Sequence, residues 1–212
     1  MRVLRPTLVP KAVFNDGEKA PPKVGAGTYT VRLSAAGQVL TSPLEVRPKP
    51  GDRTTAADLA AQYDLLLAIR DRLSDTHRAV LEIRDTRGQL LDLGARAERL
   101  GKGAALKARA DLLAGKLTAL EHELTNPDIR ADEDSLNYEP KLDHDWTFLA
   151  AAVGASDSRP TAGSAAYYGV LKERLDGILS RWRSVLSSEV AAFGAEVEAL
   201  KLPRVAPAPP KD

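Results

Sequence analysis

The sequence contains no cysteine and only three histidines among 212 residues. The absence of cysteine excludes disulfides, thiolate metal ligands and cysteine nucleophiles, but it leaves the cellular compartment open. Neither positive nor negative charge dominates, because 30 Lys and Arg residues balance 29 Asp and Glu residues to a net charge of +1. Such a chain has no long-range field to attract a phosphate backbone, so we expect no nucleic-acid partner.

Long apolar runs are also missing. No run approaches the roughly 18 consecutive apolar residues of a membrane span, and residues 1–5 lack the apolar core of a signal peptide. We therefore expect no membrane-spanning segment. The length is sufficient for one domain or two small ones.

The first fifty residues differ in composition from the rest. They hold seven of the 14 prolines, which excludes a long helix there. Alternating apolar residues predict strands over 28–33 and 39–46, joined by a turn at Ala36 and Gly37. Pro43 predicts that the second strand is an edge strand or carries a bulge. Residues 4–14 are a candidate for one more strand, because an isolated hairpin is marginally stable in water.

Helical spacing begins after a short linker at 47–52. A capping pattern at Thr55 and Asp58 opens a helix that we expect to end near residue 99. Apolar residues at gaps of three and four predict further helices over about 106–124, 142–153 and 161–203. The predicted fold class is α+β, mainly α: an antiparallel three- to four-helix bundle (51–203) preceded by a small β-hairpin segment (1–50). The Pro-rich tail, 204–212, is expected to be disordered.

The sequence offers few candidates for metal chemistry. Asp143, His144 and Asp145 are adjacent on a helix, where neighbouring side chains point about 100° apart and cannot converge on one ion. We interpret them as a polar helix start. His77 and His122 have no second His at zinc-binding spacing and are expected at the surface. The acidic run at 132–134 lacks the alternating ligands of a calcium loop. We expect no metal, no cofactor and no catalytic residues.

The remaining features favour structural roles. Charges of both signs on the first helix predict a solvated, ion-paired face. Tyr63, Trp146, Trp182 and Phe193 have the spacing of core residues, with carbohydrate stacking on an exposed Trp146 as the alternative. We expect one loop segment to be structural: its polar side chains should cap backbone groups, and its two large side chains should anchor it against the helices. The segment comprises Asp134, Ser135, Leu136, Asn137 and Tyr138.

Three segments together resemble a known family: Gly-Thr-Tyr-Thr-Val-Arg-Leu at 27–33, Ile-Arg-Asp at 83–85 and Asp-Ser-Leu-Asn-Tyr at 134–138. With the return strand at 41–47 and Arg-Pro-Thr at 159–161, their order is similar to the C-terminal region of bacterial sortilin-like (VPS10-type) β-propeller proteins, often labelled BNR or Asp-box repeat glycosyl hydrolases. The resemblance spans nearly the entire chain. It does not include the propeller repeats.

This resemblance implies a fragment of a larger, exported protein, with Met1 as an internal or reassigned start. It implies that the hairpin is the remnant of an Ig-like (FlgD-like) sandwich and that the 134–138 loop is structural. The expected function is a non-catalytic C-terminal structural or interaction module whose partner is the upstream propeller domain or another protein. The alternative is an accessory part of a propeller-type glycoside hydrolase.

Overall fold

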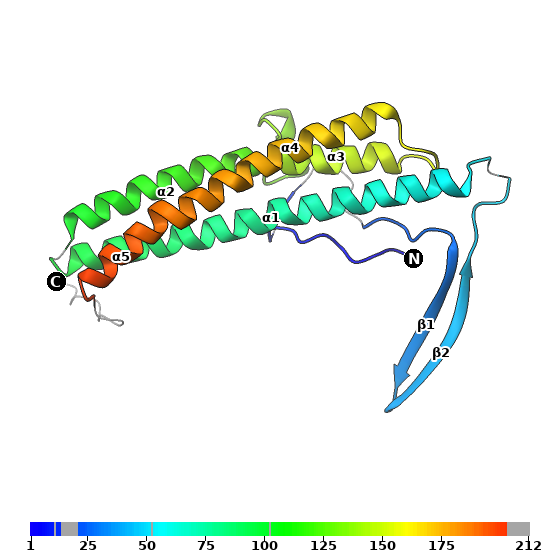
Figure 1. Cartoon of the computed structure of the whole chain (residues 1–212), viewed down its shortest axis with the longest axis horizontal. Helices are drawn as coiled ribbons and strands as arrows, with labels where there is room; N and C mark the ends of the chain where they lie inside the picture. Colours follow the sequence, from blue (N-terminus) through cyan, green and yellow to red (C-terminus); the bar gives the residue numbers. More distant parts are fainter. Residues whose placement is uncertain (11, 14–20, 52, 102, 203–212) are drawn as a thin grey trace.

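The computed structural model describes residues 1–10, 12–13, 21–51, 53–101 and 103–202. A long helical bundle occupies most of the molecule, and a two-stranded hairpin projects from one end of it (Figure 1). The predicted class, α+β and mainly α, is confirmed. The Pro-rich tail lies outside the described residues.

Helix α1 (Ala56–Arg99) runs the length of the bundle. Its 44 residues span about 66 Å at about 1.5 Å per residue. The predicted cap is confirmed, because the Thr55 hydroxyl accepts the Asp58 N–H at 3.1 Å. The seam of α1 is buried as its spacing predicts, with Ile69, Leu73, Val80, Ile83 and Leu90 in the core.

Two shorter helices lie in series beside α1 (Figure 1). Helix α2 (Ala104–Leu124) packs on the second half of α1, and α3 (Leu142–Gly154) packs on the first half. The return helix is continuous: α4 (Ala162–Val185), a π-helical turn η2 (Leu186–Val190) and α5 (Ala191–Ala199). The bundle thus has the antiparallel, three- to four-helix arrangement that the seams predict.

Helices α1 and α2 approach closely at their connected ends. A Cβ on Gly94 would lie 2.8 Å from the Cβ of Ala110, and one on Gly103 would lie 2.7 Å from the Cβ of Ala97. Such distances are far below van der Waals contact, so a Cβ at either position would force the neighbouring atoms to shift. From the sequence, Gly94 only weakens the helix; in the structure it permits the helix–helix contact.

Strands β1 (Gly27–Ala35) and β2 (Gln38–Val46) pair in an unbroken antiparallel register, in which Ala35 lies opposite Gln38. The two turn residues have φ angles of 49° and 77°, as a two-residue hairpin with the right-handed twist requires. Pro43 causes no bulge, and β2 pairs with β1 alone among the described strands.

The additional strand considered over 4–14 does not form in the part of that segment that the structure describes. Among the described residues near that segment, the only strand-like pairing is an isolated bridge between Arg2 and Lys23. Instead, the segment lies along α1: the Thr7 N–H donates to the Ser74 hydroxyl at 3.1 Å and the Val9 N–H donates to His77 at 2.6 Å. Side-chain acceptors on the helix therefore take the place of strand partners. Phe14 lies outside the described residues.

Candidate functional site

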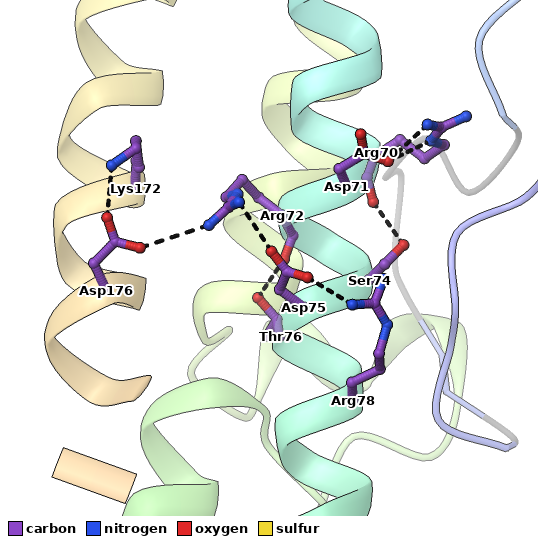
Figure 2. A network of polar contacts seen from close by, with 9 residues as sticks. All are labelled: Arg70, Asp71, Arg72, Ser74, Asp75, Thr76, Arg78, Lys172 and Asp176. Atoms are coloured by element: carbon purple, nitrogen blue, oxygen red, sulfur yellow. Dashed lines mark hydrogen bonds and ion pairs between the residues drawn. The ribbon is translucent and has the colours of Figure 1, made fainter. Parts of the chain in front are cut away.

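The charged face of α1 is paired with neighbouring side chains, as predicted. Figure 2 shows how Arg72 lies between Asp75, at 3.1 Å, and Asp176 of α4, at 3.6 Å. Asp176 also accepts from Lys172, and Asp75 from Arg78. Positive and negative groups alternate, so this face presents no uniform basic surface to a phosphate backbone.

The loop singled out from the sequence is held by its own backbone. It includes the 3₁₀ turn η1 (Asp132–Leu136). The Asp134 carboxylate accepts the N–H groups of Arg130 and Ala131 at 2.7 and 2.8 Å, which lowers the pKa of this carboxyl group. The predicted capping role of Asp134 is confirmed. The N–H of Asn137 and that of Tyr138 both donate to the Asp134 carbonyl.

The predicted anchoring of this loop is wrong. Leu136 is 76% exposed and Tyr138 is 43% exposed. The segment is held instead by hydrogen bonds to the carboxylate and carbonyl of Asp134, which do not require contacts of its large side chains with the helices. The side chain of Ser135 lies outside what the structure describes.

Three of the four aromatic residues expected in the core lie there, and the fourth, Tyr63, is half-buried. Trp146, Trp182 and Phe193 are buried, and Trp146 is 0% exposed. The alternative of an exposed Trp146 that stacks on carbohydrate is therefore wrong. Trp146 lies instead against Tyr168, with ring centroids 5.7 Å apart.

A buried polar cluster joins α1 to α3. Asp143 Oδ2 lies 3.5 Å from Nε2 of His77, and Asp143 Oδ1 lies 3.1 Å from Nδ1 of His144. The same Oδ1 accepts the backbone N–H of His144 at 2.8 Å. Burial raises the pKa of Asp143, but hydrogen bonds from His144, His77 and Thr125 outweigh it and lower the pKa to about 2. The carboxylate is therefore ionised in the folded protein at neutral pH.

The expectation that His77 lies at the surface is wrong, since it is fully buried, whereas His122 is exposed as expected. The sequence contained a signal for this burial, because residue 77 follows Leu73 by four and precedes Val80 by three on the apolar seam. The predicted helix start at Asp143 is correct, but Asp143 and His144 face the core. Periodicity alone could not pair Asp143 with His77, which lies 66 residues earlier in the chain.

An Asp–His pair resembles part of a catalytic triad, but the geometry of this pair favours a structural role. Nδ1 of His77 accepts the Val9 N–H, so this nitrogen is not available to a nucleophile. The imidazole is closed in by the N-terminal segment on one side and Asp143 on the other. Among the described residues, no three His, Asp or Glu side chains are grouped to hold a metal ion.

Nearly every residue of the two hairpin strands is exposed. Register places Tyr29, Val31, Leu33, Leu40 and Leu44 on one face, and four of these, all except Tyr29, are 38 to 63% exposed. The other face carries mainly hydroxyl and charged side chains. No helix packs over either face in the described part of the chain (Figure 1). The hairpin therefore exposes an ordered apolar strip.

The two outer edges of the hairpin differ. In a two-residue hairpin the pair next to the turn is hydrogen-bonded, and the pairs then alternate. Counting from Ala35 and Gln38, the pair of Thr30 and Pro43 is not hydrogen-bonded, so Pro43 is at a position where a backbone N–H would point outward. The outer edge of β2 therefore lacks a donor, whereas β1 contains no proline.

Comparisons with known proteins do not identify the chain. It matches no protein-family model, no curated protein and no solved structure. The resemblance to sortilin-like C-terminal regions stays a prediction. Within the described residues, no helix has both the length and the apolar character to cross a bilayer.

Proposed function

We propose that this chain is a non-catalytic interaction module that docks onto a β-structured partner through hairpin β1–β2. The exposed apolar strip of the hairpin carries this proposal. A two-stranded hairpin is marginally stable alone, and more strands or a packed layer are needed to stabilise it. Full burial of one such side chain contributes about 1.5 to 3 kcal/mol, and these side chains are already about half covered. A partner that covers Val31, Leu33, Leu40 and Leu44 would therefore contribute about 3 to 6 kcal/mol of gross binding free energy.

The edge asymmetry indicates how the partner binds. An unpaired strand can add to the outer edge of β1, where every second residue, from Thr28 to Ser34, points its N–H and C=O outward. Pro43 interrupts the corresponding row of donors on β2. The apolar strip would at the same time contact the second layer of a β-sandwich. This mode requires a partner with a free sheet edge and an adjoining apolar face.

The resemblance to sortilin-like propeller proteins names a candidate for this partner. In that proposal the missing strands belong to the polypeptide upstream of Met1, and the bundle is the C-terminal module of the parent protein. The accessory role in a propeller-type glycoside hydrolase stays the alternative prediction.

A binding experiment with matched variants tests the proposal. The probe is the β-domain encoded in frame upstream of Met1, expressed separately and titrated with the whole chain by isothermal calorimetry. We expect Leu33→Lys with Leu40→Lys, a cross-strand pair on the apolar strip, to weaken binding at least about tenfold. Ser34→Lys with Thr41→Lys, on the opposite face, is the matched control.

Three outcomes would contradict the proposal. The first is that no β-domain is encoded upstream, and the second is that both double variants bind like the parent chain. The third is concentration-dependent dimerisation in sedimentation that the Leu33→Lys and Leu40→Lys changes abolish, since the strip would then serve a second copy.

A further inference from the structure

A cleft of about 650 Å³ lies where the hairpin leaves the bundle. Its floor is the first half of α1, and its walls are the N-terminal segment, the base of the hairpin and the end of α3. The volume falls within the range of about 300 to 1,000 Å³ typical of small-molecule sites. The cleft is distinct from the apolar strip of the hairpin, which lies beyond its base.

The floor of the cleft is an apolar stripe. Leu59, Tyr63, Leu66, Ile69 and Leu73 follow one another at gaps of four, three, three and four along α1. From Leu59 to Leu73 this stripe is about 21 Å long at about 1.5 Å per residue. Only Ile69 and Leu73 are fully buried; the other three are half-buried. The stripe suits a narrow, flexible hydrocarbon chain.

The rim of the cleft is basic. The described lining contains one acidic side chain, Asp157, and five cationic ones. The cationic side chains are those of Arg2, Lys23, Arg47, Lys49 and Arg70. Arg47 is paired with Glu45 at 2.6 Å, and Arg70 with Asp71 at 2.7 Å.

The other three rim cations have no carboxylate partner among the described residues. Arg2 donates to the Pro21 carbonyl at 2.6 Å, and Lys23 and Lys49 form no ion pair in the described part of the chain. Counting the partners Glu45 and Asp71, five cationic side chains face three carboxylates among the described residues, an excess of two positive charges. An anionic head group is the complement of this rim.

We propose that the cleft binds one anionic amphiphile, with its carboxylate or comparable head group at Lys23 and Lys49 and its hydrocarbon chain along the α1 stripe. The partly exposed floor gains from contact with an apolar chain. The rim discriminates by charge, since a cationic head group would meet ammonium groups that have no carboxylate partner among the described residues. This proposal is independent of the partner of the hairpin.

Calorimetric titration of the whole chain with sodium dodecanoate, below its critical micelle concentration, tests the proposal. We expect saturable binding of one dodecanoate per chain, which weakens as salt rises. Dodecyltrimethylammonium, with the same chain length and the opposite charge, is expected to bind at least about tenfold more weakly.

Charge-reversal variants locate the site. Lys23→Glu with Lys49→Glu is expected to weaken dodecanoate binding about tenfold. Arg99→Glu with Lys201→Glu changes the net charge equally at exposed positions at the other end of the bundle, and should bind like the parent chain. Circular dichroism checks that both variants are folded.

The proposal is overturned if dodecanoate binding does not saturate, or if the two double variants bind equally well. Equal affinity for the cationic amphiphile would also overturn it. So would binding to anionic phospholipid vesicles without binding to monomeric dodecanoate, because the basic rim would then serve a membrane surface.

Discussion

Two glycines in the same helix should differ in how replacement by alanine changes the free energy of unfolding. Gly88 and Gly94 both lie within α1, and replacement of a helical glycine by alanine ordinarily stabilises by about 0.8 to 1 kcal/mol. A Cβ on Gly88 meets nothing within 4 Å, so Gly88→Ala should gain this full amount. A Cβ on Gly94 would lie 2.8 Å from the Cβ of Ala110 and 3.3 Å from the Cα of Lys107.

The magnitude follows from this crowding. Overpacking of a close contact costs about 1 to 3 kcal/mol, which cancels or exceeds the propensity gain at Gly94. The propensity terms of the two variants cancel in the comparison, so Gly94→Ala should be less stable than Gly88→Ala by about 1 to 3 kcal/mol. Urea unfolding followed by circular dichroism at 222 nm measures the difference.

A double-mutant cycle tests whether the contact with Ala110 is responsible. In the Ala110→Gly background the colliding Cβ is absent, so Gly94→Ala should lose most of its penalty. If Gly94→Ala equals or exceeds Gly88→Ala in stability, or if positions 94 and 110 show no coupling, the close approach of α1 and α2 is not as described.

Two further predictions concern buried carboxylates. The pKa of Asp143 is lowered from 3.8 to about 2, so its contribution to stability is present above about pH 4 and is lost as the pH falls to about 2; the shift corresponds to about 2 kcal/mol. Urea unfolding between pH 5 and pH 2 should show this loss, and an Asp143→Asn variant with an unchanged pH dependence would contradict it. Glu121, 2% exposed, accepts from Arg84 and Arg87 at 2.6 Å each, so Glu121→Gln should destabilise by about 1 to 3 kcal/mol. The exposed pair of Glu123 and Arg181 is the control, because Glu123→Gln should change the free energy of unfolding by less than about 1 kcal/mol. Equal destabilisation by Glu121→Gln and Glu123→Gln would show that burial of the carboxylate is not decisive.

Much of the bundle followed from the sequence because helix periodicity and capping are local. Thr55 and Asp58 mark the start of α1, and the leucines from Leu106 to Leu124 that define α2 are all buried except Leu112. The hairpin was equally predictable from alternation and its turn residues. The anchoring of Leu136 was not, because the direction of a side chain in a 3₁₀ turn depends on how the turn meets the bundle.

The sequence by itself determined the elements of this protein: where helices begin and end, which stripe of each is apolar, and where the hairpin turns. Only the tertiary structure decided that His77 meets Asp143, that Gly94 allows two helices to touch, and that basic side chains gather around the α1 stripe. The physical reason is that propensity and periodicity act within a few residues along the chain. Charge pairing, close approach and clefts depend on groups that are distant in sequence and adjacent only after folding.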